Sequence, residues 1–343
     1  MKVLILSQRF STQLAERVQL LEQHGEEVFL LCFELNNRFA SRSFIFFSEP
    51  NNPVSKILFI LSLIKYFKWS DVVHWYGGDI KHYSICLWLQ RIFSKKGIIE
   101  FKKSDVFIPE IEYNDNVAYR NKWFDNVKKP DGDYQSSLSL QKLFSNNNLI
   151  PLTEASLSQY LLPDCFPPPY QFTSTTFLYD EQPKRLCKPI DKTIKIAVDI
   201  LTDHLTDELE QLLNEIETKY KRSAKITRVT SALIVDVTYA IQHCDIWIGS
   251  TVNGHYSYWD WYAFSKGKVV LTYVKPYFTK RYYKSFPLLV TDGSPLNTTI
   301  TKLLDDNLFL ENVQSQNKNY FTENLSKEKT IKGLIEFYKK VAV

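Results

Sequence analysis

The feature that most constrains the fold is an alternation of short apolar runs with longer helical segments. In the first hundred residues the apolar runs predict strands at 3–6, 27–33, 42–47, 72–75 and 97–101. The segments between them predict helices at 13–24, 53–69 and 79–93. Strands that alternate with helices in this way are typical of βαβ units, which build a parallel sheet with helices on both faces. The first half therefore predicts a doubly wound α/β domain.

The second half repeats this pattern after a break. Pro163, Pro167, Pro168 and Pro169 interrupt regular structure, and a polar linker follows. Strands are then predicted at 193–200, 225–229, 245–249, 268–274 and 288–291, and helices at 206–220, 233–242, 258–266 and 295–305. A chain of 343 residues suits two domains better than one. Two Rossmann-like domains would face each other across a cleft, as in the α/β folds that bind ligands there.

These patterns set the expected domain boundaries. We predict an N-terminal domain at 1–165, a linker at 166–191, a C-terminal domain at 192–325 and a C-terminal helix at 326–343. The last segment is amphipathic, so it can pack back on the N-terminal domain.

Residues 105–145 are polar and less periodic, which indicates either an excursion over the ligand cleft or a long surface insertion. A strand at 149–153 and a short helix at 154–162 follow.

Composition excludes several classes of protein. The net charge is only +4, from 42 basic and 38 acidic residues, so the basic stripe of a nucleic-acid-binding protein is not expected. No apolar run reaches the roughly 18 residues of a membrane span. The five cysteines and six histidines lack metal-ligand spacing, which indicates reduced thiols and no protein-ligated metal. The chain opens directly on a strand, without a signal peptide, so we expect a soluble cytoplasmic protein.

The glycine-rich signatures of common nucleotide enzymes do not occur. Neither G-x-G-x-x-G nor G-x-x-x-x-G-K-[ST] is present, which counts against a dinucleotide oxidoreductase and a P-loop enzyme. G-x-S-x-G does not occur either, which disfavours an α/β-hydrolase.

The densest group of polar side chains follows the strand predicted at 245–249. The segment reads strand, loop, helix and strand, and the helix is closed by Gly267. Open α/β sheets bind ligands at the carboxyl ends of their strands, which is where this loop would lie. The polar or titratable residues offered are Ser250, Thr251, Asn253, His255 and Asp260. From these residues alone, a ligand site and an ordinary surface loop are equally supported interpretations of this segment.

Two strand ends in the first half offer similar chemistry. His74, Tyr76, Gly77 and Gly78 follow one strand and lead into a helix, whose N-terminus can hold an anion. After the next strand the chain reads Glu100-Phe101-Lys102-Lys103-Ser104-Asp105. A carboxylate beside lysines suits contacts with hydroxyls or phosphate, and a solvated charge run is the equal alternative.

Two basic segments suggest membrane or phosphate contacts. Residues 56–68 form an apolar helix with lysines at intervals, for which burial against the sheet is favoured over an interfacial helix on an anionic membrane. Lys275 opens a basic aromatic loop that continues to Lys284. That loop suits phosphate or lipid head groups, or is simply solvated.

Several of these segments together resemble a known family. They are the opening M-K-V-L-I-L with A-E-R-V-Q-L-L-E-Q-H-G-E-E-V-F-L-L, the strand D-V-V-H at 71–74, K-S-D at 103–105, D-I-W-I at 245–248, G-H-Y at 254–256 and A-F-S-K-G-K-V-V at 263–270. In this layout the chain resembles GT-B glycosyltransferases of the large retaining group (group 1). The resemblance implies two facing Rossmann-like domains, a UDP-, GDP- or CMP-linked sugar donor, a surface glycan or glycolipid acceptor, and no protein-ligated metal.

The resemblance also assigns roles to residues. Asp105 would orient acceptor hydroxyls, His255 would stabilise the leaving phosphate, and Asp260 or Tyr262 would hold the donor's ribose or base. The remaining donor-binding residues implied are Ser250, Thr251, Asn253, Gly254, Lys266, Lys275, Thr202 and His204. The acceptor-binding residues implied are Arg9, His74, Tyr76, Gly77, Gly78, Lys102, Lys103 and Ser104.

The chain departs from the family pattern at the donor site. Tyr262 stands where the family has a ribose-binding glutamate, and the acidic segment 199–207 replaces a basic pair, with only His204 able to become positive. A departing diphosphate needs positive charge, which would have to come from His255, Lys266 and Lys275, or from Arg9 and Lys102. Two alternatives follow: a non-catalytic subunit that partners an active enzyme, and a transferase that uses a CMP-sugar. The expected location is the cytoplasm, with peripheral contact at the inner face of a membrane.

Overall fold

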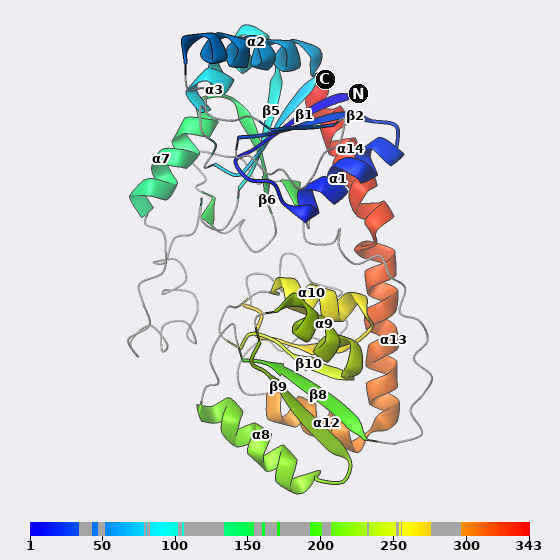
Figure 1. Ribbon diagram of the computed structural model, residues 1–343. Coiled ribbons are helices and arrows are strands. Elements are labelled where there is room, and N and C mark those ends of the chain that lie inside the picture. Colours follow the sequence, from blue (N-terminus) through cyan, green and yellow to red (C-terminus); the bar gives the residue numbers. More distant parts are fainter. Residues whose placement is uncertain are drawn as a thin grey trace. The chain divides into compact units, whose positions relative to one another are not determined.

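A computed structural model describes the chain over residues 1–33, 43–46, 52–78, 80, 83–101, 105, 134–153, 160–161, 170–171, 193–200, 207–231, 233–251, 254, 256–275 and 296–343. The chain forms two compact units (Figure 1). The first comprises Met1–Ile111, Lys129–Phe177 and Glu328–Val343, and the second comprises Glu112–Lys128 and Leu178–Lys327. Each unit has its own sheet and its own hydrophobic core.

The first unit is built on a parallel sheet of order β3-β2-β1-β4-β5-β6-β7. Its strands are β1 Lys2–Ser7, β2 Glu27–Cys32, β3 Phe44–Phe46, β4 Val72–Tyr76, β5 Lys96–Glu100, β6 Leu149–Thr153 and β7 Tyr170–Gln171. Strand β1 pairs with both β2 and β4, and the strand order reverses between β1 and β4. This is the switch point beside which open α/β sheets bind ligands.

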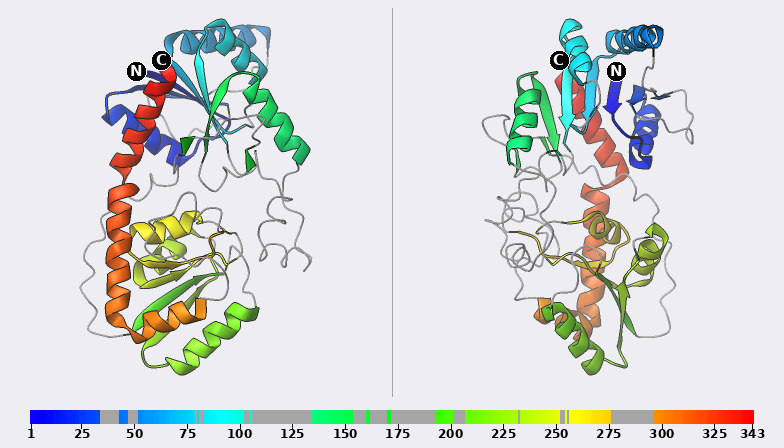
Figure 2. Two further views of the ribbon diagram at one scale, coloured as in Figure 1. Left: turned by 180° about the vertical axis from the view of Figure 1, so that it is seen from behind. Right: turned by 60° about the vertical axis from the view of Figure 1, so that its left-hand side comes forward.

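Helices cover both faces of this sheet. They are α1 Thr12–Gln23, α2 Pro53–Trp69, α3 Tyr83–Ile92, α7 Tyr134–Ser145 and α14 Lys327–Ala342. Side chains alternate between faces along a strand, and β4 shows the division: His74 contacts Tyr338 of α14, whereas Trp75 contacts Gln90 of α3 and Phe144 of α7. α1 and α14 therefore share one face, and α3 and α7 lie on the other (Figure 2).

The second unit has a smaller parallel sheet of order β11-β10-β8-β9. Its strands are β8 Ile194–Asp199, β9 Ala224–Val229, β10 Ile246–Ile248 and β11 Val269–Leu271. Its helices are α8 Asp207–Lys219, α9 Ile234–His243, α10 Tyr258–Ser265, α12 Leu296–Asp305 and α13 Asn307–Asn324. One core joins the sheet to α9 and α10, and the other joins it to α8 and α12. The predicted doubly wound α/β architecture is confirmed.

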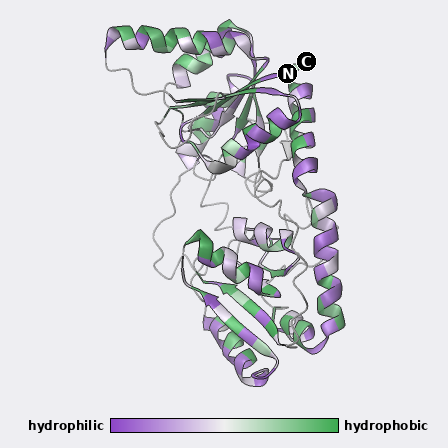
Figure 3. Ribbon diagram, turned by 45° about the vertical axis from the view of Figure 1, so that its right-hand side comes forward, coloured by the Kyte–Doolittle hydropathy of each residue, from purple (hydrophilic) through white to green (hydrophobic). Residues whose placement is uncertain are grey.

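Helix α2 illustrates both a confirmed prediction and an unexpected surface. It begins at Pro53, as predicted, because Asn52 caps it: Oδ1 of Asn52 accepts from the backbone N of Ser55 at 2.8 Å. Phe59, Leu63 and Phe67 are buried, as expected for packing against the sheet. The opposite side of the helix is also apolar and is exposed, and α2 is accordingly green over most of its length in Figure 3.

The sequence patterns missed two helices. Residues 105–145 were expected to be irregular, but α7 occupies Tyr134–Ser145, and α13 occupies Asn307–Asn324 without having been predicted. Both helices are mostly polar, so their apolar periodicity is weak. Asp306 was the available signal for α13, since its side chain accepts from the backbone N of Phe309 as an N-cap. Most of the predicted helix at 154–162 and all of the strand at 288–291 lie outside the described residues.

Across the part of the chain that the structure describes, no helix combines the length and the apolar character that crossing a membrane requires.

Candidate functional site

The loop after β10 is shaped by a close approach between Gly249 and Asp260. A methyl group added at Gly249 would lie 1.8 Å from Oδ1 of Asp260, well inside atomic contact. Only glycine therefore allows the chain to leave β10 beside this carboxylate. The backbone N of Gly249 still donates to the carbonyl of Leu271 at 2.9 Å, so the turn begins while β10 is held to β11.

Asp260 is fully buried and organises the start of α10. The backbone N of Ser257 donates to its Oδ2 at 2.7 Å, and Oγ of Ser257 accepts from the backbone N of Asp260 at 3.2 Å, which makes a reciprocal cap. Nε1 of Trp247 donates to Oδ1 at 2.9 Å. Burial raises the pKa of Asp260 to about 7, against the opposing effect of these hydrogen bonds.

These contacts correct one expectation. Asp260 was expected to hold the donor's ribose or to act in catalysis, but its side chain is 0 % exposed and both oxygens are engaged within the protein. The same contacts explain why the residue is acidic at this position. A carboxylate accepts from two donors at once, whereas an amide side chain would present an N–H to one of them. Asp260 is a structural residue of the loop.

Other predicted donor residues do converge at the carboxyl edge of the second sheet. The carbonyl of Ser250 accepts from the backbone N of Tyr273 at 2.9 Å and from Oγ1 of Thr272 at 2.6 Å. The carbonyl of Gly254, which has φ +72°, accepts from the backbone N of Lys275 at 2.8 Å. The loop after β10 and the segment after β11 are thereby joined, and Ser250 and Lys275 are both buried.

Two further predicted donor residues lie elsewhere on α10. The phenol oxygen of Tyr262 accepts from Nε2 of Gln242 on α9 at 3.1 Å. Lys266 is the C-cap residue of α10, and its Nζ lies 5.2 Å from the centroid of the Tyr262 ring. The chain passes from Lys266 into the first residues of β11, so Lys266 lies toward the amino edge of the sheet. Lys266 was expected to bind the donor, and α10 separates it from the loop by the length of that helix.

In the first unit, the segments after β4 and β5 meet as expected. The backbone N of Gly77, which has φ +92°, donates to the carbonyl of Glu100 at 2.8 Å. The backbone N of Gly78 donates to Oδ2 of Asp105 at 2.9 Å. Arg9 is exposed and follows β1, the strand beside β4, so it leaves the sheet at the same edge. Arg9, Gly77, Gly78 and Asp105 are therefore grouped around the switch point of the first sheet.

His74 and Glu100 belong to a buried network instead. The guanidinium of Arg17 donates to Glu100 through Nη1 at 2.5 Å and Nη2 at 3.2 Å. Nε2 of His74 lies 3.1 Å from Oε2 of Glu100, and Nδ1 of His74 lies 2.6 Å from the hydroxyl of Tyr338. In a neutral imidazole with its proton on Nε2, Nδ1 accepts from the Tyr338 hydroxyl while Nε2 lies beside the Glu100 carboxylate. His74 is 0 % exposed, so its predicted contact with an acceptor is wrong in this arrangement.

The charges in this network are balanced by pairing. Burial would raise the pKa of Glu100, but the adjacent Arg17 guanidinium outweighs it and the pKa falls to about 2. Burial lowers the pKa of His74, so the imidazole is held neutral. Tyr76, another predicted acceptor residue, is half-buried, with its ring centroid 5.3 Å from the Arg17 guanidinium carbon. Sequence reasoning missed Arg17, although its spacing from Leu14 and Leu21 places it on the buried side of α1.

Seven expected site residues lie outside the described residues: Lys102, Lys103, Ser104, Thr202, His204, Asn253 and His255. Thr251 is described and half-buried beside Ser250. Among the described residues, no group of three or more His, Cys, Asp or Glu side chains is arranged to hold a metal ion.

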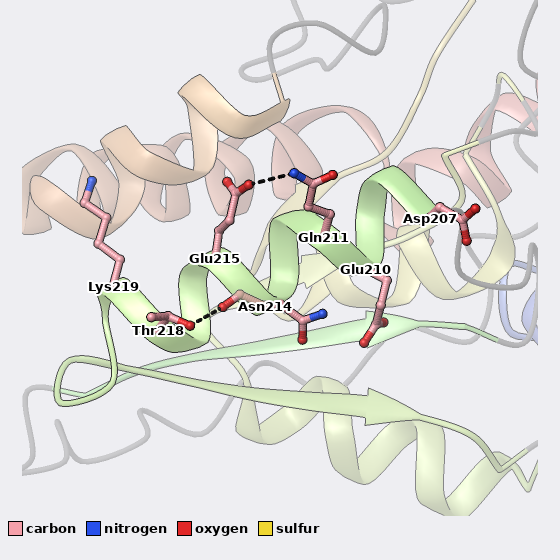
Figure 4. A pocket seen from close by; sticks show the side chains of 7 residues that line it. All are labelled: Asp207, Glu210, Gln211, Asn214, Glu215, Thr218 and Lys219. Carbon is pink, nitrogen blue, oxygen red and sulfur yellow. Dashed lines mark hydrogen bonds between the residues drawn. The ribbon is translucent and has the colours of Figure 1, made fainter.

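A hollow along α8 does not belong to this site. It is lined by Asp207, Glu210, Gln211, Asn214, Glu215, Thr218 and Lys219, all from one helix (Figure 4). Gln211 donates to Glu215 at 3.1 Å, and Thr218 donates to the carbonyl of Asn214 at 2.8 Å. Its three carboxylates and single lysine would repel a nucleotide diphosphate. None of its residues was expected in the site.

Comparison with known proteins identifies the fold. No family model and no curated protein sequence matches this chain. Among solved structures, the chain is similar to a sucrose-phosphate synthase from Thermosynechococcus elongatus, with 9% identity over 99% of both chains and a TM-score of 0.58. It is also similar to the lipopolysaccharide outer core galactosyltransferase WaaB, with 9% identity over 99% of this chain and 100% of that chain and a TM-score of 0.51.

A third similar structure is a UDP-GlcNAc 2-epimerase from Neisseria meningitidis, with 11% identity over 99% of this chain and 100% of that chain and a TM-score of 0.50. All three similarities extend over nearly the whole chain at very low identity, so they bear on architecture and not on substrate. With two Rossmann-like doubly wound units, this chain has the GT-B fold.

Proposed function

We propose that this protein is a glycosyltransferase that moves a sugar from a nucleotide-activated donor to a surface glycan or glycolipid, with retention of configuration. The observation that carries the proposal is the convergence at the carboxyl edge of the second sheet. There Ser250 and Gly254 are tied to the segment that ends in Lys275, and Thr251 follows Ser250 in the same loop. The loop would supply polar groups, and Lys275, which is only 1 % exposed beside that loop, would act on a diphosphate as a nearby buried charge.

The acceptor would bind to the first unit. Gly77, Gly78 and Asp105 lie together at the switch point, and exposed Arg9 follows the neighbouring strand. In this proposal the carboxylate of Asp105 orients acceptor hydroxyls while it accepts from the Gly78 backbone, since a carboxylate has room for more than one donor. His255 would stabilise the leaving phosphate and Tyr262 would contact the base or ribose. A peripheral position at the inner face of a membrane suits a lipid-linked acceptor.

Donor binding tests the proposal most directly. We expect calorimetry with UDP, GDP and CMP to show binding of one nucleotide, and the matching nucleotide sugar to be hydrolysed slowly without acceptor. Lys275→Gln should weaken that binding by at least about tenfold, because a buried positive charge beside the loop is lost. Lys266→Gln removes the same charge from the far end of α10 and should leave affinity unchanged. No binding of any of the three nucleotides would refute a transferase.

A second candidate function is a non-catalytic subunit that partners an active glycosyltransferase. The observation that favours it is the commitment of Asp260 to Ser257 and Trp247, since this carboxylate was the nearest substitute for the ribose-binding glutamate replaced by Tyr262. An interaction module should bind none of the three nucleotides. Preference for CMP in the same titration would instead indicate a CMP-sugar donor, whose single phosphate needs less positive charge.

A further inference from the structure

The outer side of α2 carries an unpartnered apolar stripe. Val54 is 66 % exposed, Ile57 59 %, Leu58 58 % and Leu61 55 %. Their spacing of three, four and seven residues from Val54 places them on one side of the helix. The residues that face the sheet, Phe59, Leu63 and Phe67, are on the other side. α2 is therefore apolar on two sides, and its packing within the chain accounts for only one.

Helix α3 extends this surface. It packs beside α2 and, like α2, connects strands on the face opposite α1 and α14. Trp88 is 55 % exposed and Ile92 is 52 % exposed, four residues apart on its outer side. Exposed apolar side chains gathered on two neighbouring helices mark an interaction site, and an exposed indole is typical of the boundary between lipid and water.

The charges around the patch identify its occupant. Lys65 and Lys68 continue the Val54 stripe toward the C-terminus of α2, and Arg91 lies between Trp88 and Ile92 on α3; all three are exposed. Segments 52–70 and 83–96 contain six basic residues and no acidic one: Lys56, Lys65, Lys68, Arg91, Lys95 and Lys96. Such a surface is complementary to an anionic one. A second copy of the chain would fit less well, because a two-fold contact would place two surfaces of the same positive sign against each other.

We infer that this α2–α3 face, defined by Val54, Ile57, Leu58, Leu61, Lys65, Lys68, Trp88, Arg91 and Ile92, docks on an anionic phospholipid bilayer. α2 has 17 residues and would lie in the plane of the interface with its apolar stripe among the acyl chains. Lys65, Lys68 and Arg91 would extend to lipid phosphates, because their long stems allow the charge to remain in water. The inference rests on surface chemistry and holds whichever reaction the protein catalyses.

Vesicle flotation of the full chain tests the inference. We expect the protein to float with phosphatidylcholine vesicles that contain about one third phosphatidylglycerol, and to remain unbound with phosphatidylcholine alone, because the surface potential attracts the basic residues. Binding should weaken as salt is raised, since screening shortens that attraction. Binding that is independent of both anionic lipid and salt would overturn the inference.

Matched variants locate the surface. Ile57→Ser with Leu61→Ser should reduce partitioning by at least about tenfold, because two apolar side chains no longer enter the acyl region. Ile234→Ser with Val235→Ser is the control: these residues are 69 % and 67 % exposed on α9 of the second unit, and their replacement should leave partitioning unchanged. Equal partitioning of wild type and the α2 variant, with both folded by circular dichroism, would refute the assignment.

The basic residues have a control of their own. Lys65→Gln with Lys68→Gln should lower partitioning on anionic vesicles at low salt. Lys329→Gln with Lys332→Gln removes the same charge from exposed positions on α14 and should leave partitioning unchanged.

Light scattering tests the alternative occupant, a second copy of the chain. A dimer that is abolished by the Ile57 and Leu61 substitutions would assign the face to a second copy and overturn the lipid surface.

Discussion

Nδ1 of His74 lies 2.6 Å from the hydroxyl of Tyr338, although 264 residues separate the two in the chain. The contact joins β4, at the centre of the first sheet, to α14, the last helix. Ile331, Leu334 and Tyr338 of α14 are fully buried in the same core as Val3 and Ile5 of β1. The C-terminal helix is therefore an integral part of the first unit, and the polar contact lies within an apolar interface.

Removal of the Tyr338 hydroxyl should destabilise the first unit. Tyr338→Phe leaves Nδ1 of His74 buried without its partner, which costs about 1–3 kcal/mol. Thermal unfolding should begin at lower temperature than in wild type. Tyr239→Phe removes a hydroxyl from a ring that is 63 % exposed and should leave the transition in place. If both variants unfold like wild type, the buried contact contributes nothing.

Neutralisation of Glu100 should be more damaging than neutralisation of an exposed carboxylate. Glu100→Gln leaves the buried Arg17 charge without its counter-ion and should cost about 3–5 kcal/mol in urea unfolding. Adding Arg17→Met should recover part of that loss, since no unpaired charge remains. Glu217→Gln, which breaks the exposed pair with Arg228, should cost less than about 1 kcal/mol. Additive losses for Arg17 and Glu100 would contradict the coupling.

The same network predicts loss of stability in acid. Burial lowers the pKa of His74 in the native protein, whereas the unfolded imidazole titrates near 6.5. The unfolded chain therefore binds the extra proton first, and the contribution of this network to the stability of the first unit should fall as pH decreases below about 6.5. Glu100, with a native pKa of about 2 and an unfolded value near 4.3, adds a second loss below about pH 4.3.

Thermal unfolding of wild type and His74→Gln at stepped pH measures this dependence as the difference between the two profiles, because Asp260 of the second unit, with a native pKa of about 7, contributes in the opposite direction to both. His74→Gln keeps a hydrogen-bonding side chain but cannot bind the proton, so the decline just below about pH 6.5 should flatten while the decline at lower pH remains. His243, which lies on the surface of α9, serves as the control, and His243→Gln should retain both declines. An unchanged profile in His74→Gln would show that another group is responsible.

Two glycines should respond oppositely to the same substitution. Gly249→Ala places a methyl group 1.8 Å from Oδ1 of Asp260, so the loop after β10 must move and the second unit should be destabilised by several kcal/mol. Gly333→Ala, on α14, brings the new methyl group within 4 Å of nothing apart from its chain neighbours and the backbone of its own helix, and should stabilise the helix by about 0.5–1 kcal/mol. Unfolding midpoints of the two variants give the comparison. A wild-type midpoint for Gly249→Ala would show that the loop has no fixed geometry.

Local sequence was sufficient for much of the fold. Strands such as β1 and β8 are buried on both faces, so their apolar runs identify them without knowledge of their neighbours. The capping residues Asn52 and Ser257 mark helix starts in the same local way. α7 and α13 were missed because they bury few side chains, and a mostly polar helix has little apolar periodicity to detect.

The candidate site was also predictable only in part. Strand order predicts that polar residues gather at strand ends. The group formed by Gly77, Gly78 and Asp105 required only the prediction that adjacent strands are parallel. Strand order did not predict which of these polar side chains would be buried. Asp260 and Lys275 were both candidates from the sequence, yet both side chains are buried, and Asp260 caps α10 and accepts from Trp247, 13 residues earlier.

The sequence by itself determined the succession of strands and helices, the two-unit plan and the strand ends where polar residues gather, because these depend on periodicity and on residues close together in the chain. Only the tertiary structure decided that His74 and Glu100 are buried against Arg17 and Tyr338 and that the apolar outer side of α2 is left uncovered. Both outcomes depend on which faces meet in space. Pairing of side chains 83 and 264 residues apart leaves no local pattern from which it could be predicted.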